Sequence, residues 1–137
     1  MIEKLLLSVV AGVLVGLDRE KKKKPTGIRT SAMVCMGCCL FTILAQMIPS
    51  SYIDRGHLIA NLPQGIGMIC ALAVIADTKR NHIIGLTSAA ILWVLAAVGV
   101  SIGLGFYGIA FEAIVLILTV VYVTDFLRRK QVFKGEK

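Results

Sequence analysis

Three cysteines at helical spacing raise the first question of chemistry in this 137-residue sequence. Cys35, Cys38 and Cys39 stand at positions i, i+3 and i+4 of an apolar run, which places them on one face of a helix. Thiolates could bind a metal, but zinc sites usually carry cysteines on turns, and forming thiolates inside an apolar helix is costly. We therefore predict that these residues, and Cys70 in a later run, are small buried hydrophobic residues, with no metal and no cofactor.

No motif for enzyme catalysis is present. His57 and His82 fall in polar connectors, without a carboxylate or a second histidine at a metal-ligand spacing. The sequence contains no nucleophile motif, phosphate-binding loop, dinucleotide fingerprint or HExxH zinc motif. We predict that the protein is not an enzyme and has no catalytic residues.

Glu112 is an acidic residue inside the last apolar run. Glu112 lies about a third of the way into this predicted helix. Burying an ionised carboxylate there costs about 2–3 kcal/mol or more in free energy unless the carboxylate is paired or hydrated. Such acids often mark a functional site, whereas a hydrogen bond to the nearby Tyr107 or a neutral carboxyl would be structural. The sequence supports both alternatives equally.

The segment GLDREKKKKPTGIRT, residues 16–30, holds the strongest group of polar residues. Charges of alternating sign end one apolar run, and Arg29 falls near the start of the next. Pro25 and Gly27 would let the connector fold back, so that Arg29 pairs with Asp18 or Glu20. The predicted network comprises Asp18, Arg19, Glu20, Arg29, Thr30 and Asp77.

Membrane helices are the elements that must position these residues. Apolar residues make up 57% of the chain, charged residues 17%, and the mean hydropathy is +0.83, against roughly 25% charged residues in soluble domains. The apolar runs are long and do not alternate as barrel strands do. They predict a one-domain, all-α integral membrane protein with five transmembrane helices near 2–17, 31–48, 58–76, 83–101 and 106–127, and a basic cytoplasmic tail over 128–137.

The distribution of Lys and Arg predicts the orientation, because basic loops stay in the cytoplasm. The first connector, the third connector and the tail together carry 13 Lys and Arg residues, whereas the opposite side holds only Lys4 and Arg55. We therefore expect the N-terminus outside and the C-terminus in the cytoplasm. The run Lys21 to Lys24 is then a solvated topological anchor, and we predict no nucleic-acid binding.

The connector between the last two runs, residues 100–108, contains three glycines and no charge. It could be a tight turn or a kink in one long helix. A single helix over residues 83–127 would be about 67 Å long, roughly twice the thickness of the hydrocarbon layer. A turn is therefore required.

Two GxxxG pairs predict close helix packing. Gly12 and Gly16 form one pair, and Gly99 and Gly103 form the other. Small residues at this spacing let helix backbones approach each other in a membrane. We expect these contacts within one chain, with a homodimer interface as the alternative.

The order of motifs resembles the MgtC/SapB family of bacterial inner-membrane proteins. GLDREKKKKPTGIRT is similar to that family's G-L-[DE]-R-E and P-x-G-x-R-T elements, the latter including Gly27. Gln64, Gly65 and Gly67 resemble a shifted start of its Q-x-x-x-G-I-G-F-L-G-A-G segment, although MICALAVI replaces the Gly-Ala-Gly step. GLTSAAILW, with Thr87 and Trp93, is close to G-L-T-T-A-A-x-x-W. The resemblance covers nearly the whole chain, and we expect it to involve the family's N-terminal membrane domain only.

This resemblance implies a multi-pass protein of the bacterial inner membrane, linked to growth in low magnesium and to virulence through survival inside host cells. Family members are thought to act by contacting other membrane proteins, including the F-type ATP synthase, more than by transporting magnesium. The expected partners are the lipid bilayer and another membrane protein. The alternative is an oligomeric cation transporter or channel that uses Glu112, Asp77 and the residues around Asp18.

Overall fold

The computed structural model describes residues 1–24, 26–49, 55–77 and 82–132. For residues 55, 75–77, 82–84 and 128–132 it describes the backbone only. All statements below concern these residues.

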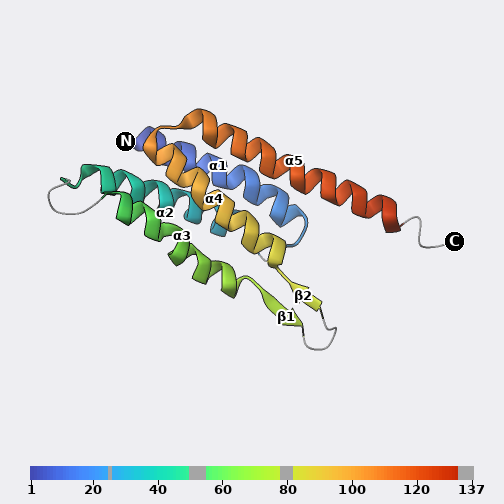
Figure 1. The fold of residues 1–137 in the computed structure, drawn as a ribbon. Helices are drawn as coiled ribbons and strands as arrows, with labels where there is room; N and C mark the ends of the chain where they lie inside the picture. The colour runs from blue at the N-terminus through green and yellow to red at the C-terminus, as the bar shows by residue number, and fades with distance from the viewer. Residues whose placement is uncertain (25, 50–54, 78–81, 133–137) are drawn as a thin grey trace.

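Five helices make up the fold, as the apolar runs predict (Figure 1). In chain order the elements are α1 (Ile2–Lys21), α2 (Ile28–Met47), α3 (Arg55–Leu72), β1 (Ile75–Asp77), β2 (His82–Ile84), α4 (Leu86–Leu104) and α5 (Tyr107–Val132). The helices differ from the apolar runs by several residues at most ends. Polar residues extend α1, α2, α3 and α5 beyond their apolar parts, whereas α3 ends four residues earlier and α4 begins three residues later than predicted, because strands occupy residues 75–77 and 82–84.

Three of the described helices are long and apolar enough to cross a membrane: α2, α4 and the Tyr107–Leu127 part of α5. Charged residues at both ends of α1 lower its hydropathy. In α3 the polar residues are His57, Asn61 and Gln64, together with Arg55 at its first position.

A short β-hairpin replaces the simple polar connector that we predicted between the third and fourth runs. Helix α3 ends at Leu72, and β1 pairs antiparallel with β2, with Asp77 opposite His82. Asp77, predicted at a helix end, therefore lies in a strand, and its side chain is outside the described residues. Gly85 then has a φ of +99°, which favours glycine, and α4 begins directly after it.

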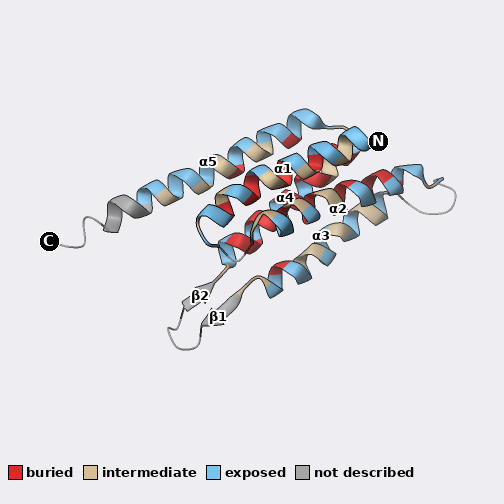
Figure 2. Cartoon of the chain, turned by 180° about the vertical axis from the view of Figure 1, so that it is seen from behind, coloured by how far each residue is buried: buried red, intermediate tan, exposed pale blue. Residues whose placement is uncertain are grey.

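The helices run alternately in opposite directions, with α2 and α4 at the centre. Helix α1 packs mainly on α2, α3 lies against α4 and α2, and α5 lies against α4 and α1. Most residues of α5 are exposed (Figure 2). In the apolar segment of α4, 56% of residues are buried, against 11% in that of α5, so α5 is the most loosely attached of the three apolar helices.

Both GxxxG pairs are used within the chain. A Cβ added to Gly12 or Gly16 would lie 2.6 Å from the Cα of Ala32 or Ile28. Both glycines therefore bring α1 against the backbone of α2, and the predicted contact within one chain is confirmed.

The second pair, Gly99 and Gly103, faces α2 where its cysteines lie. A Cβ on Gly99 would collide with the carbonyl oxygen of Cys35, and one on Gly103 would lie 2.7 Å from the Cβ of Thr42. Cys35 and Cys39 are fully buried in the core, and the nearby Cys38 and, on α3, Cys70 are also buried. The prediction of small buried residues is confirmed.

The predicted turn between the last two helices is also confirmed. Gly105 has a φ of +92° and ends α4. Its N–H donates to the Ile102 carbonyl at 3.0 Å, and the Phe106 N–H donates to the Ser101 carbonyl at 2.8 Å. This pattern satisfies the last carbonyls of α4 and reverses the chain into α5.

Candidate functional site

The end of the bundle that holds the α1–α2 connector gathers most of the polar contacts. The last turn of α1, the first turns of α2 and α4, and the C-terminal part of α5 all lie at this end (Figure 1). Consecutive helix residues point about 100° apart. Asp18, Arg19 and Glu20 therefore point toward different neighbours, and each makes a different contact.

Arg19 points into the bundle. Only 3% of its surface is exposed, and its Nη2 donates to the Oγ of Ser88, 2.5 Å away in the first turn of α4. No carboxylate within the described residues forms an ion pair with it. This hydrogen bond links α1 to α4, and its loss would be costly, because a buried charge that is poorly paired is destabilising.

Three buried polar atoms near this end have no hydrogen-bond partner among the residues that the structure covers: Arg19 Nε, Thr26 Oγ1 and Ser31 Oγ. Ser31 lies beside Gly16 at the α1–α2 contact. Buried polar atoms are usually satisfied by protein groups or by ordered water. We therefore expect bound water at this end of the bundle.

Glu20 points toward α2. Its Oε2 accepts a hydrogen bond from the Ile28 N–H at 3.1 Å, which satisfies a free donor at the N-terminus of α2 and suits the helix dipole. Gly27 makes room for this contact, because a Cβ there would lie 3.1 Å from Glu20 Oε2. Both residues belong to the predicted motif, and their role is to join α1 to α2.

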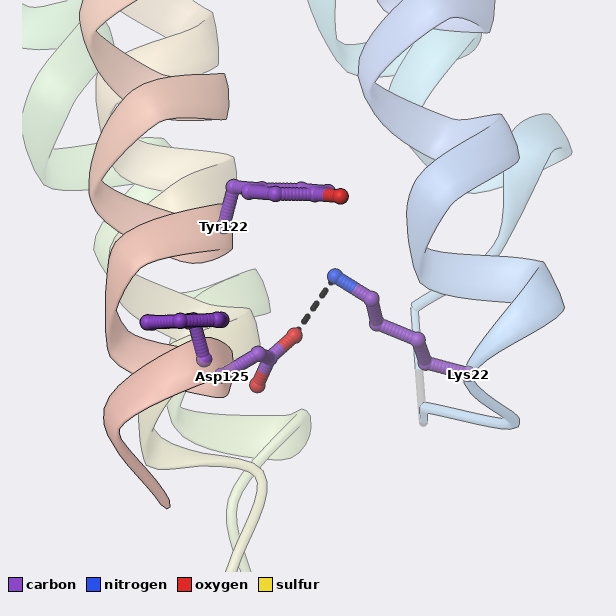
Figure 3. Close-up of a pocket in the computed structure, with 4 residues that line it drawn as sticks. Lys22, Tyr122 and Asp125 are labelled. Carbon is purple, nitrogen blue, oxygen red and sulfur yellow. Dashed lines mark ion pairs between the residues drawn. The ribbon is translucent and has the colours of Figure 1, made fainter. Parts of the chain in front are cut away.

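Lys22 bridges two carboxylates from different helices, and Figure 3 shows its ion pair with Asp125. Its Nζ lies 2.8 Å from Asp18 Oδ1 and 2.6 Å from Asp125 Oδ2 on α5. Lys22 and Asp125 line a small open pocket of about 130 Å³, together with Tyr122 and Phe126. Burial alone would lower the pKa of Lys22, but its hydrogen bonds with Asp125 and Asp18 outweigh burial and raise that pKa.

Two predictions about this segment are wrong. Arg29 is exposed and forms no ion pair within the described residues, because it lies in the first turn of α2 while Glu20 is already bound to Ile28. Lys22 is not merely one of a solvated run, because it is the residue that pairs with Asp18. Sequence reasoning missed Ser88 and Asp125, whose only signal was a polar residue near the end of an apolar run.

The other predicted residues do not join this cluster. Glu112 is exposed on α5 and makes no hydrogen bond to Tyr107 in the part of the chain described here. The remaining ones are exposed or partly buried at separate places: Thr30 on α2, Gln64, Gly65 and Gly67 on α3, and Thr87 and Trp93 on α4.

A smaller polar contact closes the opposite end of the bundle. Lys4 Nζ and Gln46 Nε2 both donate to the Gly103 carbonyl, at 2.9 and 3.1 Å. A cation at a helix C-terminus is favourable. This contact, which the sequence did not reveal, ties α1 and α2 to the end of α4.

Comparison with known proteins gives a consistent match. The sequence profile of the MgtC family matches residues 5–130. An uncharacterized protein of Haemophilus influenzae is 37% identical over 134 residues, covering 92% of this chain and 56% of that protein. Protein SapB of Bacillus subtilis is 34% identical over 134 residues, covering 93% of this chain and 57% of that protein.

A third relative, from Escherichia coli strain K12, is named putative magnesium transporter YhiD. It is 32% identical over 127 residues, covering 88% of this chain and 58% of that protein. The chain thus spans little more than half the length of these relatives. No solved structure gives a significant match.

Proposed function

This chain belongs to the MgtC family, and from that premise we propose that it is a multi-pass protein of the bacterial inner membrane that binds another membrane protein. In this proposal it neither catalyses a reaction nor carries ions by itself. Its action belongs to growth in low magnesium or survival inside host cells, and the F-type ATP synthase is one partner to test.

All five helices span the membrane in this proposal, with the N-terminus outside and the C-terminus in the cytoplasm. The 13-to-2 distribution of Lys and Arg between the two sides supports this orientation. The alternating helix directions support it too, since they bring the basic α1–α2 connector and the C-terminal part of α5 to one end (Figure 1). The charged ends of α1 would then lie at the two membrane surfaces.

The observation that carries a binding function is the apolar interior. The residues packed between the helices include Val15, Cys35, Leu92, Leu95 and Val98, all at most 1% exposed. Polar contacts gather at the ends of the bundle instead. The buried hydroxyls of Ser8 and Thr42 donate to carbonyls of their own helices. The described core therefore offers an ion few polar ligands, and ion transport by one chain is disfavoured.

Trp93 marks the face that fits a partner helix. It is 52% exposed on α4 and lines a mostly apolar groove of about 230 Å³ between α3 and α4. Pro63 and Ala97 lie in the same groove. Tryptophan in a groove of this kind is a frequent centre of binding energy.

Photocrosslinking in native membranes tests this proposal. A benzophenone amino acid at Trp93 should capture one specific membrane protein, while the same probe at Val10, equally exposed on α1, should not. Equal capture from both positions, or none from Trp93, would refute binding through this face.

The second candidate function is cation transport, which is suggested by the name of the Escherichia coli relative and by the exposed Glu112. It would require an oligomer, because the polar residue lies on the outside of the described bundle. Purified protein in proteoliposomes decides the matter. Magnesium uptake that is lost in Glu112→Gln would favour transport over the binding function.

A further inference from the structure

Glu112 lies on a face of α5 that the bundle leaves open. The side of α5 that packs on the bundle contains Ala110 and Ile117, and Glu112 lies nearly opposite to it by helical periodicity. Val115 and Leu116, one turn further on, are 44% and 63% exposed. The face is therefore apolar apart from Glu112 and Thr119, and Thr119 already donates to the Val115 carbonyl.

An apolar groove lies on the other edge of the molecule, between α2 and α3. It has a volume of about 450 Å³, and its lining includes Met33, Gly37, Phe41, Asn61, Gly65 and Ile69. A Cβ added to Gly37 or Gly65 would meet no atom within 4 Å. The two glycines thus leave space that the chain itself does not fill.

Asn61 is the only polar side chain among the residues that line this groove. It is exposed and has no hydrogen-bond partner within the described residues. In a bilayer an amide without a partner is unfavourable, and a carboxyl group is a suitable acceptor or donor for it. The groove therefore fits an apolar helix that carries one acid or amide.

The two surfaces match in depth and direction. Helices α3 and α5 both begin at the same end of the bundle and run the same way (Figure 1). At 1.5 Å per residue, Asn61 lies about 9 Å from the start of α3, and Glu112 lies about 7.5 Å from the start of α5. With these residues opposed, Leu116 falls beside Gly65.

We propose that α5 of one copy docks into the α2–α3 groove of a second copy, with Glu112 bonded to Asn61. Helices α3 and α5 lie at opposite edges of the bundle in both views (Figures 1 and 2). The contact is therefore head-to-tail: the copy that contributes α5 keeps a free groove, and the copy that contributes the groove keeps a free α5 face. This self-association goes beyond the proposed function and does not depend on it, because Trp93 lies outside both surfaces.

Cysteine crosslinking in native membranes tests the contact. One tagged chain carries Leu116→Cys and a differently tagged chain carries Gly65→Cys, and a short bismaleimide should join the two tags. A chain with both substitutions should form a ladder beyond the dimer. The unsubstituted protein, whose Cys35, Cys38, Cys39 and Cys70 are buried, gives the background. Val10→Cys on α1 replaces Gly65→Cys as the control for random collision.

The hydrogen bond is tested in the same system. Glu112→Leu should weaken the Leu116–Gly65 crosslink about 3-fold to 30-fold, the effect expected for one interhelical hydrogen bond in a membrane, whereas Glu112→Gln should retain it. A chain in which the two residues are exchanged, Asn61→Glu with Glu112→Asn, should give the Leu116–Gly65 crosslink at the yield seen before Glu112→Leu. Both positions are exposed, and unchanged circular dichroism and gel filtration in detergent would show that the variants fold.

Three outcomes would overturn the proposal. Crosslinking of Leu116→Cys chains to each other would indicate a two-fold α5 contact instead. A yield with Val10→Cys equal to that with Gly65→Cys would indicate collision only. Absence of any crosslink in folded protein would indicate that lipid fills the groove.

Discussion

Substitution of Gly16 by alanine tests the packing argument most directly. The added Cβ would lie 2.6 Å from Ile28 Cα and 3.2 Å from Ser31 Cβ, whereas ordinary Cβ contacts begin at 3.4 Å. Helix α2 must therefore retreat from α1 by about 0.8 Å, since its backbone cannot rotate out of the way. Gly37 lies on α2 and has open space at its Cβ position, so it is the matched control.

The expected cost of Gly16→Ala follows from three contributions. Overpacking of a close contact costs about 1–3 kcal/mol. The same retreat would stretch the 3.1 Å hydrogen bond from the Ile28 N–H to Glu20, and loss of such a cap costs about 1 kcal/mol. Alanine is better than glycine within a helix by about 0.5–1 kcal/mol. Gly16→Ala should lose about 1–3 kcal/mol of unfolding free energy, whereas Gly37→Ala should gain a few tenths or more.

Equilibrium unfolding in mixed micelles, with increasing dodecyl sulfate, measures the difference. The fluorescence of Trp93, the only tryptophan in the chain, and far-ultraviolet circular dichroism serve as independent probes. If Gly16→Ala is as stable as Gly37→Ala, then α1 and α2 do not approach through Gly16, and the packing described for this helix pair is wrong.

Three further predictions concern the charged end of the bundle. Ser88→Ala should lower the unfolding free energy by about 2–3 kcal/mol, because it leaves the buried Arg19 without its hydrogen-bond acceptor. A double-mutant cycle with Arg19→Met should show a coupling energy above about 1 kcal/mol. Lys22→Met should lower the unfolding free energy by about 0.5–1 kcal/mol in low salt, whereas Arg29→Ala should leave the unfolding free energy and the melting temperature unchanged. Equal losses of unfolding free energy in the two variants would contradict the assigned ion pairs. Because the pKa of Lys22 is raised in the folded state, the contribution of Lys22 to the unfolding free energy should persist up to about pH 10.4 and disappear only at higher pH. The difference in unfolding free energy between wild type and Lys22→Met, measured against pH, tests this.

The helices and their closest contacts could be predicted from the sequence because they depend on local pattern. Apolar runs determine where the helices lie, and GxxxG spacing reveals a surface that allows backbones to approach. The need for a turn within residues 100–108 follows from the length of a single helix compared with the thickness of a membrane. Each of these inferences used residues close together in the chain.

The partners of the charged residues could not be predicted in the same way. Whether Asp18 meets Arg29 or Lys22 depends on where α2 begins, and a shift of one residue turns a side chain by about 100°. Ser88 and Asp125 are far from residues 16–30 in sequence, and a lone serine or aspartate carries no pattern. The ion pair of Asp18 is therefore with Lys22 and not with the predicted Arg29.

The cysteines buried between α2 and α4 also give the protein a built-in kinetic probe. Cys35 and Cys39 have no exposed surface, while Cys70 on α3 is 9% exposed. A small maleimide can reach Cys35 and Cys39 only when α4 or α1 moves away from α2, since Cys39 also contacts the Lys4 carbonyl on α1. Their labelling rate in the native protein therefore measures how often these contacts of α2 open, and comparison with Cys70 separates that opening from motion of α3.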